Sequence, residues 1–222
     1  MARLHNDAVA VVGLGRFGLA LAQELMATGT EVLGIDTDEQ IIQRVAGSLT
    51  HAVIADATDE AALRQLGVHE FQRVVVGISD HIEASILACS NLVSFGVPDI
   101  WGKAVSEQHA RILVQVGCHH VIRPEYDTGR RVAHLIAGRL IDYIEFDDGY
   151  AIVKMRPPRE ILGQTLAACR LRQGWGVTIV GVKRAGQDFT HAVPDTVVED
   201  GDLIIVSGDR RKVEGFAELL SK

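Results

Sequence analysis

The stretch AVAVVGLGRFGLALAQELMATGTEVLGID, residues 8 to 36, decides the fold of this chain. It contains an apolar run, a turn with the spacing Gly-x-Gly-x-x-Gly, a helical repeat of apolar residues, a second apolar run and a carboxylate. This order predicts a strand, a turn, a helix and a second strand parallel to the first. A glycine turn of this kind binds nucleotide phosphates, because backbone N–H groups and the positive end of the helix face the same anion.

The three glycines of the turn each have a separate structural reason. Gly13 permits the tight turn, Gly15 lets backbone N–H groups approach a pyrophosphate, and Gly18 lets the helix pack closely against the sheet. Arg16 and Phe17 complete the motif and belong to the same set of candidate ligand-binding residues. The sequence therefore predicts a phosphate site at the start of the first helix.

Two charged residues narrow the class of nucleotide. Asp36 ends the second apolar run, about 20 residues after the turn, where a carboxylate accepts hydrogen bonds from ribose hydroxyls and repels a 2′-phosphate. The guanidinium of Arg16 lies inside the turn and can reach past the first phosphates to pair bidentately with a terminal one. NADP is therefore disfavoured, and ATP or ADP fits the pattern at least as well as NAD.

Apolar, β-branched runs alternate with helical patterns through the first half of the chain. Strands are expected at residues 8–12, 31–35, 51–55, 73–78, 100–104 and 120–122, and helices at 17–27, 39–45, 60–66, 82–95 and 107–116. Continuous apolarity in the strands indicates a parallel sheet buried on both faces. The predicted fold class is α/β, with a Rossmann-like doubly wound parallel sheet.

The pattern changes after Pro124. A long helix over 126–143 is expected to lead into a small α+β lobe, with a hairpin of strands 143–146 and 150–155 around the turn Asp147-Asp148-Gly149. The lobe continues with a helix near 165–171, strands at 177–183, 189–192 and 203–207, and a final helix at 212–220. We predict a nucleotide-binding domain over 1–125, a connecting helix over 126–142 and a C-terminal lobe over 143–222.

Polar residues follow several predicted strands, at the edge of a doubly wound sheet where ligands bind. They are Asp56, Ala57 and Thr58 after the third strand, Ile78, Ser79 and Asp80 after the fourth, Lys103 at the end of the fifth, and Glu125 after the sixth. Capping of the next helix is the commoner use of residues such as Thr58, Asp59, Ser79 and Asp80, and both uses can coexist.

Lys103 and Glu125 each have two interpretations. A lysine in an apolar strand has to turn toward an edge or a partner anion, and we favour a phosphate. Glu125 either ligates a divalent cation such as Mg²⁺ together with phosphate oxygens or is an ordinary solvated residue after Pro124.

Composition excludes several classes of partner and site. The 222 residues suffice for one Rossmann domain and a small lobe, whereas a two-domain dehydrogenase would be cramped. A net charge of -7 without a basic run argues against nucleic acid. Cys89, Cys118 and Cys169 follow no metal-ligand spacing and are expected to be small buried hydrophobes of a reduced chain. No apolar run reaches membrane-spanning length, which predicts a cytoplasmic protein that only a partner would hold at a membrane.

An enzyme is the main alternative to a binding protein. None of the histidines, which include His51, His81, His109, His119, His120, His134 and His191, lies in a recognisable catalytic pattern, and most are expected at the surface or at strand ends. An NAD-dependent oxidoreductase or NAD(H) redox sensor therefore ranks second. A nucleotide-sensing repressor ranks third, because no helix-turn-helix is evident.

A resemblance covers essentially the whole chain. The order AVVGLGRFG, GID, ADAT, VVVGISD, WGKA and VIRPE, followed by a lobe that ends in VVEDGDLIIVSG, resembles the cytosolic regulatory subunits of bacterial Ktr/Trk potassium uptake systems. These subunits consist of an RCK (TrkA-N) domain followed by a TrkA-C domain. The resemblance implies a homo-oligomeric ring, commonly of eight subunits built from dimers, beneath a membrane potassium-translocating partner of the TrkH or KtrB kind. Nucleotide exchange would alter the ring and so the ion flux.

The same resemblance implies roles for individual residues. Gly13, Gly15 and Gly18 would hold phosphates, Asp36 the ribose, and Asp56, Ala57, Thr58 and Ile78 the adenosine side. Arg16 would reach a terminal phosphate, also across the dimer, Lys103 would bind phosphate, and Glu125 would hold a divalent cation at the dimer interface. Related subunits use ATP and ADP or NAD and NADH, and some bind cyclic di-AMP in the C-terminal lobe.

Overall fold

The computed structural model describes residues 7–136, 140–146 and 148–221. Contacts within the chain divide it into two compact units, Met1–Glu125 and Tyr126–Lys222. Each unit has its own hydrophobic core. In the part of the chain that is described, no helix combines the length and apolarity that a membrane crossing requires.

The first unit is built on a six-stranded parallel sheet with the order β3-β2-β1-β4-β5-β6. Its strands are β1 (Val9–Val12), β2 (Val32–Asp36), β3 (His51–Ile54), β4 (Arg73–Val76), β5 (Asp99–Lys103) and β6 (His120–Ile122). This order reverses between β1 and β4, as in the doubly wound dinucleotide-binding fold, and a ligand crevice forms at such a point. The predicted Rossmann-like class is confirmed.

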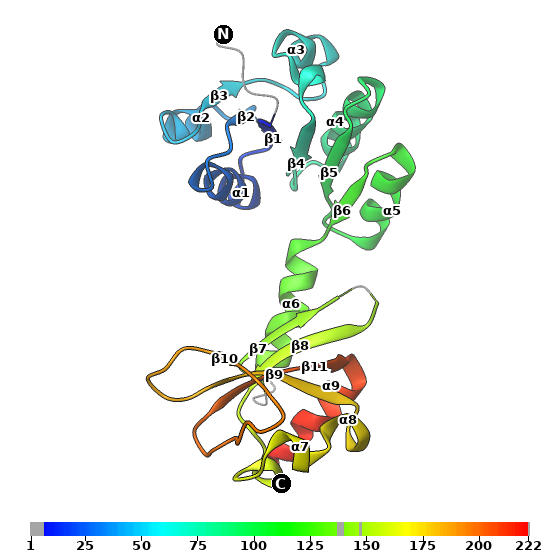
Figure 1. The fold of residues 1–222 in the computed structure, drawn as a ribbon. Helices are drawn as coiled ribbons and strands as arrows, with labels where there is room; N and C mark the ends of the chain where they lie inside the picture. The colour runs from blue at the N-terminus through cyan, green and yellow to red at the C-terminus, as the bar shows by residue number, and fades with distance from the viewer. Residues whose placement is uncertain (1–6, 137–139, 147, 222) are drawn as a thin grey trace. The chain divides into compact units, whose positions relative to one another are not determined.

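Helices cover both faces of this sheet (Figure 1). The helical elements are α1 (Arg16–Ala27), α2 (Glu39–Val45), α3 (Glu60–Gln65), the short 3₁₀ helix η1 (Val68–Glu70), α4 (Ile82–Ser94) and α5 (Glu107–Val116). Helices α1 and α2 pack on one face with Val9 and Val11 of β1, while α3, α4 and α5 pack on the other with Ala10 and Val12. This alternation along a single strand explains why β1 is apolar throughout.

The predicted elements of the first unit agree with the observed ones to within two residues at each end. Asp59 caps α3 as expected, since its carboxylate accepts hydrogen bonds from the N–H groups of Ala61 and Ala62. The capping role expected of Ser79 or Asp80 is wrong, because His81 occupies the N-cap of α4 and makes no side-chain cap.

The second unit contains a five-stranded antiparallel sheet with the order β10-β9-β11-β8-β7. Its strands are β7 (Asp142–Glu145), β8 (Tyr150–Met155), β9 (Val177–Lys183), β10 (Thr190–His191) and β11 (Leu203–Asp209). The helical elements that follow α6 are η2 (Arg159–Ile161), α7 (Leu166–Cys169), α8 (Leu171–Gly174), α9 (Arg210–Ala217) and η3 (Glu218–Ser221). Helix α9 packs against the sheet, and the predicted small α+β lobe is confirmed.

Three elements of the lobe differ from the sequence prediction. The single helix expected near residues 165–171 is split, because Arg170 has a left-handed backbone with φ +48° between α7 and α8. Strand β10 spans two residues rather than four. The final helix begins at Arg210, two residues early, and gives way to η3 after Ala217.

The connecting helix is shorter than its apolar spacing predicts. Helix α6 spans Pro124–Ile136, and strand β7 begins at Asp142, inside the range predicted to be helical. Residues 137–139 and Asp147 of the predicted hairpin turn lie outside the described residues. Leu140 and Tyr143 are buried in the core of the lobe, and Tyr143 pairs with Val153 of β8. Strand pairing and burial therefore end the helical pattern before Tyr143.

Ion pairs join α6 to the sheet of the second unit. Glu145 on β7 accepts hydrogen bonds from Arg130 Nη2 at 2.7 Å and from the Tyr143 hydroxyl at 2.8 Å. Arg131 Nη2 also donates to Asp142 Oδ1 at 2.6 Å. Burial by itself would raise the pKa of Glu145, but the hydrogen bonds from Tyr143 and Arg130 outweigh it and hold that pKa below its usual value. The carboxylate thus stabilises the attachment of α6 when ionised.

We expect Glu145→Gln to lower the free energy of unfolding at pH 7 by about 1 kcal/mol, because the charge-assisted bonds to Arg130 and Tyr143 weaken. A carboxylate with a depressed pKa contributes stability at neutral pH and loses it as the pH falls through the folded pKa. The difference in unfolding free energy should therefore narrow as the pH falls below the usual pKa of glutamate, about 4.3, and should close once the pH is below the folded pKa, as urea titrations would show. Glu160→Gln, at an exposed side chain of the same unit, is the matched control, and a gap independent of pH would contradict this role.

Candidate functional site

The glycine turn has the geometry that its motif predicts. Gly13 has φ +85°, and a Cβ there would lie 3.0 Å from the backbone nitrogen of Ile78. A Cβ on Gly18 would overlap the carbonyl oxygen of Gly13, so the first turn of α1 lies directly against the loop. A Cβ on Gly15 would meet no atom within 4 Å. Gly13 and Gly18 are thus required by packing, whereas Gly15 leaves open space next to the turn.

The start of α1 faces this open space. Gly15 is the N-cap of the helix and has no side chain to bond the first N–H groups. Uncapped N–H groups at a helix N-terminus attract anions, and the helix dipole adds to the attraction. Arg16, the first residue of α1, supplies a full positive charge at the same place.

Asp36 is tied to the turn by hydrogen bonds that sequence reasoning did not foresee. Its Oδ2 accepts from the N–H of Leu14 at 2.6 Å, and its Oδ1 accepts from the N–H of Asp38 at 2.9 Å. Asp38 in turn caps α2 by accepting from the N–H groups of Gln40 and Ile41. The carboxylate predicted to face a ribose thus also holds the glycine turn against the end of β2.

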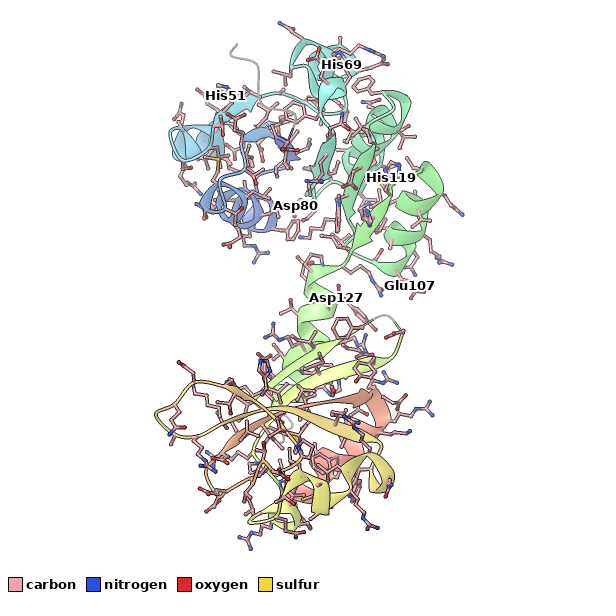
Figure 2. All side chains as sticks on the ribbon, in the orientation of Figure 1. His51, His69, Asp80, Glu107, His119 and Asp127 are labelled. Carbon is pink, nitrogen blue, oxygen red and sulfur yellow. The ribbon has the colours of Figure 1, made fainter. Side chains whose placement is uncertain are left out.

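The carboxyl ends of the strands enclose a pocket of about 590 Å³. It is lined by Gly13, Gly15, Arg16, Phe17, Asp36, Asp56, Ala57, Thr58, Ile78, Lys103 and Glu125, which are all the predicted site residues except Gly18. Gly18 lies beneath the turn instead. Thr37, Asp38 and His81 also line the pocket and were not predicted, and so does Asp80, labelled in Figure 2 on the loop between β4 and α4.

The loop after β3 is held by local and long-range hydrogen bonds. Asp56 Oδ1 accepts from both the N–H and the hydroxyl of Thr58 at 2.8 Å. Asn91 on α4 donates its side-chain amide to the carbonyl oxygens of Ala57 and Thr58 at 3.2 and 3.1 Å. Asn91 carries no sequence signal for this role, because it lies in the middle of a helix. The loop is therefore positioned before any ligand arrives.

Lys103 has the partner anion that its place in an apolar strand requires. Its side chain is 5% exposed, and its ammonium lies 2.7 Å from Glu125 Oε1. The ammonium also donates to the Ser79 hydroxyl at 2.8 Å and lies 5.5 Å from the centre of the Phe17 ring. Ser79 thus serves the lysine rather than a helix cap, since a buried cation has to be paired and hydrogen-bonded.

The Glu125 side chain is 67% exposed, whereas the side chain of its partner Lys103 is buried. The hydrogen bond from Lys103 lowers the pKa of Glu125, and the positive charge of Arg16 acts in the same direction. Among the described residues, no group of three or more His, Cys, Asp or Glu side chains is arranged to hold a metal ion. A cation at Glu125 therefore needs further ligands, which phosphate oxygens can provide.

The histidines do not gather at this pocket. His51, His69 and His119, labelled in Figure 2, lie at or just before the amino ends of β3, β4 and β6, opposite the pocket edge of the sheet. His109 is an exception to the surface or strand-end positions expected of most histidines, since it is 2% exposed. Burial lowers the pKa of His109.

The cysteines Cys89 and Cys118 are buried as predicted, and Cys169 is half-buried. The fold brings the first two together under Gly102 of β5, where a Cβ would lie 3.3 Å from Cys118 Sγ and 3.7 Å from Cys89 Sγ. Both thiols fill the core between the sheet and its helices.

In sequence, the chain is similar to two protein-family models and to proteins of potassium uptake systems. The TrkA-N domain model matches residues 9–124, and the TrkA-C domain model matches residues 150–221. The chain is 33% identical to Ktr system potassium uptake protein A of Bacillus subtilis, over 97% of this chain and 98% of that protein. It is 35% identical to the Vibrio alginolyticus protein of the same name, over 92% and 93% of the two chains.

Solved structures with the same fold include the GsuK RCK domain, with a TM-score of 0.68 and 16% identity over 98% of this chain and 48% of that one. This chain thus spans about half the length of that structure. The GsuK channel bound to NAD gives a TM-score of 0.53 at 21% identity, covering 98% of this chain and 39% of that one. The structure of GsuK bound to ADP gives a TM-score of 0.51 at 15% identity, covering 57% of this chain and 33% of that one.

The glycine turn thus lies within the residues that match the TrkA-N model, and strands β8 to β11 of the antiparallel sheet lie within those that match the TrkA-C model. The chain belongs to the family of RCK proteins composed of a TrkA-N domain followed by a TrkA-C domain.

Proposed function

We propose that this protein is a nucleotide-sensing regulatory subunit of a potassium uptake system. The observation that carries the proposal is the pocket itself, in which an open glycine turn, Arg16 and Lys103 converge at the end of a doubly wound sheet. In this proposal residues 1–125 bind the nucleotide, residues 126–142 connect, and residues 143–222 form the second regulatory lobe. The relatives named for Ktr potassium uptake support the transport role.

The ligand we favour is ATP or ADP, with NAD or NADH as the alternative. Structures with the same fold are bound to NAD in one case and to ADP in another, which supports a nucleotide without selecting one. Two cationic side chains in the pocket, Arg16 and Lys103, favour a ligand whose negative charge ends in a terminal phosphate. Mg²⁺ would bind with the phosphates and Glu125, and Asp36 would hold the ribose.

Thermal unfolding with ATP, ADP, NAD or NADH, each with and without Mg²⁺, is the direct test. A ligand present at about 100 times its dissociation constant adds about 2.7 kcal/mol of stability. Stabilisation by ATP and ADP supports the proposal. Stabilisation by NAD or NADH alone would favour a redox sensor or an oxidoreductase instead.

We expect Arg16→Ala to lower the affinity for ATP about tenfold and the affinity for ADP less than threefold. The reason is that only ATP carries the terminal phosphate with which a guanidinium at the start of α1 would pair. Calorimetric titration of both nucleotides measures the difference. Arg111→Ala, at an exposed position on α5, is the control and should change neither affinity. Equal losses for ATP and ADP would rule out a terminal-phosphate role.

We propose a binding function rather than catalysis. His81 is the one histidine among the described residues that lines the pocket, and it lies at the N-cap of α4 without a side-chain capping hydrogen bond. Hydride transfer requires a positioned acid or base beside the cofactor. Reduction of NAD by a panel of small 2-hydroxy acids, or oxidation of NADH by the corresponding 2-oxo acids, would overturn this part of the proposal.

The exposed face of α6 supports assembly into a homo-oligomer. No residue of this helix is buried, and Tyr126, Val132 and Ile136 are all exposed. Uncovered apolar residues along one helix indicate a protein partner. We propose a ring of dimers, an octamer as in related subunits, which acts on a membrane potassium-translocating subunit of the TrkH or KtrB kind and is held peripherally at the cytoplasmic face through it.

A second ligand site is proposed in the C-terminal lobe. A groove of about 390 Å³ there is lined by Arg170 and Arg172 together with apolar residues such as Leu166, Val193 and Pro194. Cationic groups beside apolar walls fit an anionic ligand with aromatic bases, and cyclic di-AMP is our candidate. Its addition should raise the unfolding temperature of the unmodified chain and not of Arg170→Ala.

A further inference from the structure

The Lys103–Glu125 ion pair joins two residues of very different freedom. The lysine is fixed in β5, almost completely buried, and bonded to Ser79 as well as to Glu125. Glu125 is two-thirds exposed and lies in the first turn of α6. If the ion pair opens, the exposed Glu125 carboxylate remains solvated by water. The buried Lys103 ammonium, by contrast, would be left without a compensating negative charge. Glu125 is therefore the partner that another anion can replace.

The charge of the pocket makes such a replacement depend on Glu125. Among the described residues that line the pocket, five are carboxylates and two are cationic. The carboxylates are Asp36, Asp38, Asp56, Asp80 and Glu125, and the cations are Arg16 and Lys103. A polyphosphate entering this pocket meets an excess of negative charge. Of the two cations, Lys103 is already neutralised by Glu125.

We propose that a nucleotide phosphate replaces Glu125 at Lys103, so that the Lys103–Glu125 ion pair acts as an exchangeable latch that reports nucleotide binding to the start of α6. Without a ligand, the glutamate closes on the lysine. With a nucleotide, a phosphate oxygen accepts the lysine N–H, and the released carboxylate turns outward, where a divalent cation shared with the phosphates can hold it. This inference rests on the proposed nucleotide function and adds a regulation of the same site.

The latch gives Glu125 an effect of opposite sign in the absence and presence of a divalent cation. Without the cation, the carboxylate competes with phosphate for Lys103 and so opposes binding. With the cation, the carboxylate becomes a ligand and supports binding. A residue that served only as a cation ligand would, in the absence of the cation, affect binding no more than any other pocket carboxylate does.

The test is a double-mutant cycle with ATP as the probe, measured by calorimetry in EDTA and again in Mg²⁺. In EDTA, Glu125→Gln should bind ATP about fivefold more tightly than the unmodified chain, which is about 1 kcal/mol. Asp80→Asn removes an unpaired pocket carboxylate and controls for general electrostatics, with an expected change below about twofold. In a Lys103→Met background, Glu125→Gln should change the affinity in EDTA by no more than Asp80→Asn does.

Three outcomes are distinguishable. If the unmodified chain binds no nucleotide, the proposed function fails and the latch fails with it. If the chain binds ATP but Glu125→Gln leaves the affinity in EDTA unchanged, only the latch is overturned. The latch is likewise overturned if Glu125→Gln increases the ATP affinity by the same factor in the unmodified chain and in the Lys103→Met background. Because Lys103→Met leaves the Ser79 hydroxyl without its donor, Lys103→Gln is the second variant, and thermal unfolding shows that each variant is folded.

Discussion

Gly18→Ala should destabilise the first unit by about 3 kcal/mol, lower its unfolding midpoint by roughly 10 °C and abolish nucleotide binding. The added methyl group would overlap the carbonyl oxygen of Gly13, which belongs to the backbone and cannot rotate away as a side chain could. The turn and α1 would have to separate, and the uncapped N–H groups would lose their common direction. Circular dichroism during heating and ATP titration measure the two effects.

Gly15→Ala is the matched control, because it places the same methyl group in the same turn without a clash. Gly15 has φ −63°, and its Cβ would meet no atom within 4 Å. Stability should change by less than about 0.5 kcal/mol. Binding should weaken at least about tenfold, because the methyl group occupies the space through which phosphates approach the backbone. Equal stability losses in the two variants would show that the turn is looser than the structure indicates.

Ile136→Glu should convert the proposed assembly largely into smaller species. Ile136 is 80% exposed on α6, so a charge there costs the fold of a single chain little. At an interface between chains, the same carboxylate would be taken out of water without a partner, at a cost of several kcal/mol. Sedimentation velocity at micromolar concentration measures the change. Unfolding of the separated chains should be unaltered.

Ile54→Glu controls for adding a carboxylate at an exposed apolar position. Ile54 is 55% exposed on the edge strand β3 of the first unit, away from α6 in sequence. The assembly should keep its size in this variant. An assembly that survives Ile136→Glu as well would exclude α6 as its interface.

The strands and helices of the first unit follow from the sequence because their causes are local. The apolar runs need burial on both faces, and the glycine turn permits one backbone path, so the observed elements lie within two residues of the predicted ones. Helix α6 shows the limit of such reasoning. Its apolar spacing continues to Tyr143, but burial of Leu140 and pairing of Tyr143 with Val153 favour a strand.

Most residues of the candidate site could be predicted from the sequence, but the contacts between them could not. The glycine motif and the residues at the predicted strand ends indicated most of the pocket-lining residues from Gly13 to Glu125, but not Thr37, Asp38 or His81. The bonds between them were not predictable. Leu14 to Asp36, Asn91 to the loop after β3 and Lys103 to Ser79 join residues far apart in the chain.

The sequence by itself determined the doubly wound sheet, the glycine turn and the charged residues around it, because backbone conformation and burial pattern are local properties that a chain encodes in residue order. Only the tertiary structure decided that Glu125 neutralises Lys103, that Asp36 holds the turn, and that the helical pattern after Pro124 ends at Ile136. The partner of a buried polar group depends on which distant groups the fold brings within hydrogen-bond distance, and residue order does not state that distance.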